Sequence, residues 1–120
     1  MLANLVRQYE DIVKSWTITK LDHEGPNIRL KARVDFIDDS TLAIRQVYIS
    51  SDTFKYSCHW QDKNAKLICR WDNAPHWQNL STFPYHRHIA NDSPPVEDVN
   101  AGDLEAVFRH INSVMTGHSH

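Results

Sequence analysis

Three stretches of the sequence alternate apolar and polar residues with a period of two, and this alternation restricts the fold more than any other feature. They cover residues 28–36, 54–61 and 66–72. A strand that buries one face and exposes the other produces this pattern. Two further strands are predicted over residues 17–23 and 42–49, where β-branched residues are frequent. The middle of the chain is therefore predicted to form a sheet.

An amphipathic helix is predicted at each end, because apolar residues there recur at steps of three and four. The two stripes consist of Leu2, Leu5, Val6, Tyr9, Ile12, Val13 and Trp16, and of Leu104, Val107, Phe108, Ile111, Val114 and Met115. Helix, about five strands and helix in this order predict an α+β fold, with an antiparallel sheet and both helices packed on one face. We expect one domain over residues 1–120, with a flexible tail at residues 116–120.

Residues 83–95 are predicted to form a loop between the sheet and the second helix. This segment contains Pro84 and the pair Pro94-Pro95. Consecutive prolines exclude both the interior of a helix and a central strand.

The distribution of charge indicates an anionic ligand, although the formal net charge is only −2 and argues against a general nucleic-acid coat. Residues 28–88 hold nine Lys or Arg against six acids, whereas residues 89–120 hold one Arg against five acids. The first sixteen residues carry acids and no continuous apolar run, which predicts a cytoplasmic protein without a membrane span. The two cysteines, Cys58 and Cys69, are interpreted as buried thiols.

Residues 54–61 and 66–72 are predicted to pair as a hairpin across the polar turn at residues 62–65. With Lys63 and Asn64 at the centre of the loop, Cys58 lies opposite Cys69, Trp60 opposite Leu67 and Tyr56 opposite Trp71, all on the core face. The other face then carries His59, Arg70 and Asp72. In this register His59 and Arg70 are diagonal neighbours.

Residues 56–88 concentrate the side chains that carry chemistry, with four of the eight histidines and three of the four tryptophans. Cleavage of a phosphodiester without a metal needs a base, an acid and a cation on the phosphate. His59, His76, His86 and His88 are candidate proton carriers, and Arg70 is the candidate phosphate ligand because its planar fork can bind two oxygens. Asp72 is a candidate for orienting an imidazole. A single histidine is more simply an exposed strand residue, but four beside arginines favour a site.

Further residues of the segment are candidates for binding substrate: Tyr56 through its hydroxyl, Asn73, Trp77 by stacking on a base, and Arg87. Simpler interpretations exist for several of them. Arg70 and Asp72 can form a structural salt bridge, and Asn73 can cap the turn that follows residue 72. Trp60 and Trp71 are expected in the core.

A metal site is the second interpretation of the same histidines. His86 and His88 alternate in an extended segment, and with His76 and Asp72 they would complete a ligand set. No cysteine or second carboxylate cluster supports it, so we predict no metal and no other cofactor. The chain has only three glycines, which excludes a glycine-rich phosphate loop.

The segment resembles the TumE family of toxins from bacterial type II toxin-antitoxin systems. The resemblance lies in His59-Trp60, in the string Arg70-Trp71-Asp72-Asn73-Ala74-Pro75-His76, and in Thr82-Phe83-Pro84-Tyr85-His86-Arg87-His88. It implies a growth-inhibiting toxin with RNA-cleaving activity, encoded beside a DNA-binding antitoxin that silences it. The turn at residues 62–65 lacks the glycine that we expect in many relatives.

Three functions follow from these residues. The first is a metal-independent endoribonuclease toxin with RNA as substrate and a helix-turn-helix antitoxin as partner, with homodimerisation left open. The second is a hydrolase that uses a histidine-ligated metal. The third is a non-catalytic module that binds nucleic acid or protein through its basic face and aromatic rings.

Overall fold

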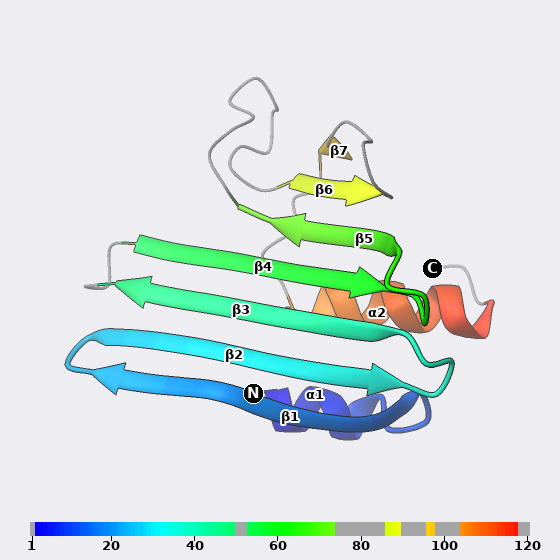
Figure 1. Ribbon diagram of the computed structural model, residues 1–120, viewed down its shortest axis with the longest axis horizontal. Helices are drawn as coiled ribbons and strands as arrows, with labels where there is room; N and C mark the ends of the chain where they lie inside the picture. The colour runs from blue at the N-terminus through cyan, green and yellow to red at the C-terminus, as the bar shows by residue number, and fades with distance from the viewer. Residues whose placement is uncertain (1, 50–52, 74–85, 90–95, 98–103, 118–120) are drawn as a thin grey trace.

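The computed structural model describes residues 2–49, 53–73, 86–89, 96–97 and 104–117, and these form one sheet and two helices (Figure 1). The elements in chain order are α1 (Leu2–Gln8), β1 (Val13–Glu24), β2 (Asn27–Phe36), β3 (Thr41–Ile49), β4 (Thr53–Gln61), β5 (Leu67–Asp72), β6 (His86–Ile89), β7 (Val96–Glu97) and α2 (Leu104–Thr116). The strands pair in sequence order, each antiparallel to the next. The predicted α+β fold is confirmed, with β6 and β7 added to the five predicted strands.

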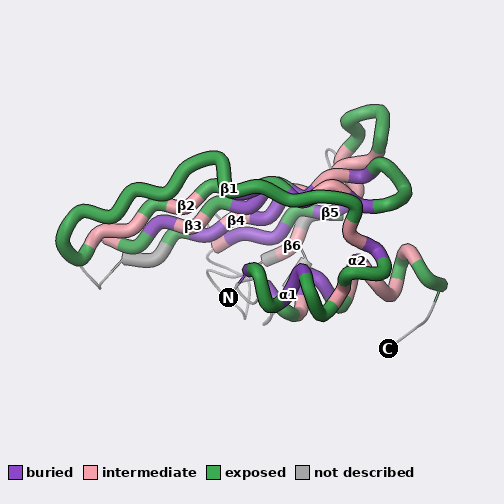
Figure 2. Tube along the Cα trace, turned by 90° about the horizontal axis from the view of Figure 1, so that it is seen from below, coloured by how far each residue is buried: buried purple, intermediate pink, exposed green. Residues whose placement is uncertain are grey.

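Both helices pack on the same face of the sheet, as Figure 2 shows. The core contains one apolar row from each of β2 to β5 and the apolar stripes of the helices, including Val34, Phe36, Leu42, Ile44, Cys58, Trp60, Trp71, Leu5, Val107, Phe108 and Ile111. Residues that alternate with this row in β2 to β5 point the other way. We call the side of the sheet opposite to α1 and α2 the open face. No described helix covers it.

Two sequence predictions about element boundaries were wrong. The first helix ends at Gln8 and not near Trp16, because residues 13–24 form the long strand β1, paired with β2 along its length. Val13 and Trp16 fit a helical stripe and a strand equally well, and pairing with β2 decides in favour of the strand. The second error concerns β6, which lies within the predicted loop and pairs with β5.

The β4–β5 hairpin forms, but its register differs by two residues from the prediction. Trp60 lies opposite Cys69 and Cys58 opposite Trp71, and the ladder is irregular between Trp60 and Gln61. The difference arises from a longer connection, in which the carboxylate of Asp62 accepts hydrogen bonds from the backbone N–H groups of Asn64 and Lys66. The predicted burial of Cys58, Trp60 and Trp71 is confirmed.

Ala65 takes the left-handed backbone conformation in this turn, with φ of 63°. A Cβ atom makes that conformation unfavourable by about 1–2 kcal/mol. Ala65→Gly should therefore raise the free energy of unfolding by about 1 kcal/mol, measured by urea denaturation. Ala43→Gly, an exposed position inside β3, is the control and should lower stability by about 0.5–1 kcal/mol. Equal losses in the two variants would contradict the turn geometry.

Candidate active site

The candidate site is centred on His59 in β4 and Arg70 in β5, which lie directly opposite each other in the sheet. Both occupy open-face positions, since their neighbours Trp60, Cys69 and Trp71 are buried on the helix side. The register that the structure adopts thus brings the two closer than the predicted diagonal arrangement. Their Cβ atoms are expected within about 5.5 Å of each other, as for any directly opposed antiparallel pair.

Arg70 is held by an ion pair with Asp72 on the same strand. The Nε atom of Arg70 lies 3.2 Å from Oδ2 of Asp72. The carboxylate side chain is only 4% exposed, whereas the Arg70 side chain is 48% exposed. A buried carboxylate therefore fixes one edge of an exposed guanidinium. Since this contact uses Nε, the two Nη groups of the planar fork remain for an oxyanion.

The environment of His59 favours the neutral imidazole. Partial burial of the ring, and then the positive charge of Arg70, lower the pKa of His59 below its ordinary value, and a hydrogen bond with Gln61 opposes the shift. A neutral imidazole can accept a proton at neutral pH. His59 is therefore suited to act as a base.

Strand β6 brings two further predicted residues into register with this pair. His88 is the partner of Arg70, and His86 is the partner of Asp72. The side chains of both histidines lie outside the described part of the structure. His76 and Trp77 fall within residues 74–85, which the structure does not describe.

Three of the predicted substrate-binding residues lie away from the His59–Arg70 pair, in the core, at the end of the β4–β5 pairing or on the helix side. Tyr56 is 3% exposed in the core, where the Cys58 thiol donates a hydrogen bond to its hydroxyl oxygen. Asn73 accepts a hydrogen bond from the Tyr56 backbone N–H through its side-chain oxygen, and so extends the β4–β5 pairing. Arg87 is the register partner of Trp71 and thus lies at a helix-side position of β6.

The described residues contain no group of three or more His, Cys, Asp or Glu side chains arranged to hold a metal ion. Of the predicted metal ligands only Asp72 has a described side chain, so this alternative lies mostly outside the described residues. Cys58 and Cys69 are free and buried, as predicted. Burial raises the pKa of the Cys58 thiol to about 12, and a thiol in this state is unreactive.

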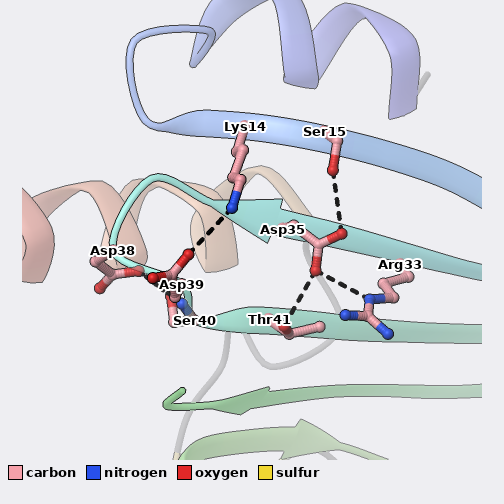
Figure 3. A network of polar contacts seen from close by, with 8 residues as sticks. All are labelled: Lys14, Ser15, Arg33, Asp35, Asp38, Asp39, Ser40 and Thr41. Carbon is pink, nitrogen blue, oxygen red and sulfur yellow. Dashed lines mark hydrogen bonds and ion pairs between the residues drawn. The ribbon is translucent and has the colours of Figure 1, made fainter.

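The sequence analysis missed a set of polar residues that share the open face with His59. Asp35 accepts hydrogen bonds from Arg33, Ser15 and Thr41 (Figure 3). Burial alone would raise the pKa of Asp35, but the hydrogen bonds from these donors, together with the Arg33 charge, lower it. Its carboxylate is thus ionised and neutralises Arg33. The polar residues that alternate with apolar ones over residues 28–36 could have indicated this polar face from the sequence.

The fold and the register define a small α+β protein with an imidazole and an exposed guanidinium opposed on one open face of the sheet. The model of the family described as Toxin TumE matches residues 2–116. The chain therefore belongs to the TumE toxin family, and the resemblance seen in residues 56–88 is confirmed. Membership in a toxin family implies an antitoxin as partner.

Comparison with curated proteins gives no match, and comparison with solved structures gives none either. Among the described residues, no helix has the length and apolar character needed to cross a membrane.

The effect of Arg70 on His59 can be measured by NMR titration of the imidazole. In the wild type, the pKa of His59 should lie below that of an unperturbed histidine. Arg70→Gln removes the nearby cation and should raise it. Arg33→Gln is the control, because Arg33 is paired with Asp35 and should leave the His59 pKa nearly unchanged. An unchanged pKa in Arg70→Gln would show that the two side chains do not interact.

Proposed function

We propose that this toxin is a metal-independent endoribonuclease that inhibits growth by cleaving RNA in the cytoplasm. The observation that carries the proposal is the direct opposition of His59 and Arg70 on the open face, with Arg70 fixed by Asp72. Phosphodiester cleavage by the neighbouring 2′-hydroxyl needs a base and a cation near one phosphate, and this pair supplies both.

His59 is proposed as the base. Its neutral imidazole accepts the proton of the 2′-hydroxyl, and the 2′-oxygen then attacks phosphorus. The bond to the 5′-oxygen of the next nucleotide breaks, which leaves a 2′,3′-cyclic phosphate and a free 5′-hydroxyl. His59 lies two residues before the end of β4 and is partly exposed on the open face, which leaves the ring accessible to a strand of RNA.

Arg70 is proposed to stabilise the negative charge that develops on the phosphate oxygens. Its Nη groups donate hydrogen bonds to these oxygens, while Asp72 holds Nε. Asp72 is thus a positioning residue. A guanidinium fixed before the substrate binds needs little reorganisation in the transition state.

The leaving 5′-oxygen requires a proton from an acid, and we propose one of His76, His86 and His88 for this role. The pairing of β6 with β5 supports His86 and His88, because their backbone positions adjoin Asp72 and Arg70. Trp77 is proposed to stack on a base. Tyr56, Asn73 and Arg87 have structural contacts or helix-side positions, and we give them no contact with substrate.

We propose that a DNA-binding helix-turn-helix antitoxin, encoded beside the toxin in a type II system, is the partner that silences it. Family membership supports an antitoxin of some kind. The antitoxin would inhibit most simply by covering the open face.

Cleavage of a labelled RNA by purified protein tests the proposal. The wild type should cut in the presence of EDTA. His59→Ala should reduce the rate by about 10²–10⁴-fold, as expected for loss of a general base. Arg70→Ala should reduce it by about 10²–10³-fold, as for loss of an oxyanion donor.

His23→Ala is the matched control, because His23 is an exposed histidine at the far end of β1. It should cleave at the wild-type rate. Cleavage by the His59→Ala, Arg70→Ala double variant at the wild-type rate would remove the proposed site. Activity that EDTA abolishes and added metal restores would instead establish the metal-dependent hydrolase.

A further inference from the structure

Beyond the candidate site, the open face carries four exposed cations that take part in none of the described ion pairs. They occupy adjacent positions on three strands, namely Arg29 and Lys31 in β2, Arg45 in β3 and Lys55 in β4. In the sheet register, Arg29 and Lys55 flank Val47 on either side, and Lys31 lies directly opposite Arg45. Val47 is buried although it lies on the open face, so the stems of these long side chains shield it.

The carboxylates on this face do not neutralise these cations. Three of these carboxylates are paired with other basic residues, in the described pairs Lys20 with Asp22, Arg33 with Asp35, and Arg70 with Asp72. The fourth, Glu24, lies near the end of β1 beside Arg29 and is in no described ion pair. Within the described part of the chain, no ion pair involves Arg29, Lys31, Arg45 or Lys55. A concentrated positive field therefore remains on a molecule whose net charge is negative.

Two hollows of the open face join these cations to the candidate site. The first is lined by Arg29, Lys31, Arg45 and Lys55, with Val47 among its lining residues. The second is also lined by Lys31 and Arg45, and it extends to Ser57, Gln61 and His59. The two hollows are neighbours that share Lys31 and Arg45, and together they extend over the open face from Lys55 to His59. We call the two hollows together the basic groove.

We propose that the basic groove binds the phosphate backbone of single-stranded RNA and guides the strand to His59 and Arg70. This inference rests on the proposed ribonuclease function and identifies the surface that holds the substrate on one side of the cleaved bond. The charge of the groove is complementary to a polyanion. Its continuity with His59 favours the strand that is cut over an acidic protein segment.

The side chains of the groove indicate recognition of phosphates and not of bases. Among the described open-face positions of β1 to β5 there is no Phe, Tyr or Trp on which a base could stack. Arginine and lysine contacts to phosphate position a strand but carry no sequence information. A flexible single strand is required, since the 2′-oxygen must align with the leaving oxygen for attack. The groove should thus bind RNA of any sequence.

The four cations predict a measurable salt dependence. For single strands, the slope of log K against log salt is about −0.7 for each phosphate contact, which gives about −2.8 for four contacts. Affinity should accordingly fall about fifty-fold between 50 and 200 mM salt through these contacts alone. A surface without such contacts would show almost no salt dependence.

The test uses the full chain and a fluorescein-labelled 2′-O-methyl RNA of twelve or so nucleotides, which cannot be cut because it lacks the nucleophile. Dissociation constants are measured by anisotropy at several salt concentrations. Replacement of Arg29, Lys31, Arg45 and Lys55 by Gln should reduce the slope by about 2.8 and weaken binding by at least tenfold at 50 mM salt. Two double variants should each reduce the slope by about 1.4, because each removes two of the four phosphate contacts. They are Arg29→Gln with Lys55→Gln, and Lys31→Gln with Arg45→Gln.

A matched control removes four exposed cations elsewhere, Arg7 in α1, Arg109 in α2, and Lys63 and Lys66 in the β4–β5 turn. This control variant has the same net charge as the groove variant. Its slope of log K against log salt should stay close to that of the wild type. Circular dichroism of all variants verifies folding. If the groove and control variants lose equal affinity, the effect is general charge and the proposal is overturned.

The proposal and the ribonuclease function can fail separately. Salt-dependent binding through the groove by a wild type that cuts no RNA supports the groove and removes the catalytic function. Cleavage with an unchanged KM in the groove variants supports the function and removes the groove. Normal RNA binding by these variants, with loss of antitoxin binding, would assign the groove to a protein partner and also overturn the proposal.

Discussion

The antiparallel pairing of β4 with β5 is the interaction on which the candidate site depends. It sets His59 opposite Arg70 and at the same time directs Trp60 and Trp71 into the core. A slip by one residue would exchange the two faces and expose the tryptophans. The burial of those large rings therefore stabilises the arrangement of the polar pair, and the apolar core determines where His59 and Arg70 lie.

Packing of both helices on one side gives the sheet two different environments. The helix side contains the apolar core. There the buried indole N–H of Trp60 donates a hydrogen bond to the hydroxyl oxygen of Ser40. The open face contains the charged residues, several of them paired with one another. Because no described helix covers this face, His59 and the cations outside the described ion pairs are accessible to a large ligand. The same division explains how an acidic protein overall can present a basic surface.

Much of the fold was predictable, because a period of two in residues 28–36, 54–61 and 66–72 admits only half-buried strands. The end of α1 was not predictable, since Val13 and Trp16 suit both a helical stripe and a strand. The hairpin register depended on a left-handed Ala65, which the residue type does not signal. In the site, His59, Arg70 and Asp72 were predictable from residue type and alternation. The basic groove was not, because it requires knowing which strands are neighbours and which acids are paired.

We propose that the open face, and not the helix side, receives RNA. Chemical-shift mapping of backbone amides during titration with 2′-O-methyl RNA tests it most directly. Our account predicts that the largest changes occur in β2 to β5 at Lys31, Arg45, His59 and Arg70, while α1 and α2 are unaffected. Changes confined to the two helices, or an absence of changes at saturating RNA, would contradict it.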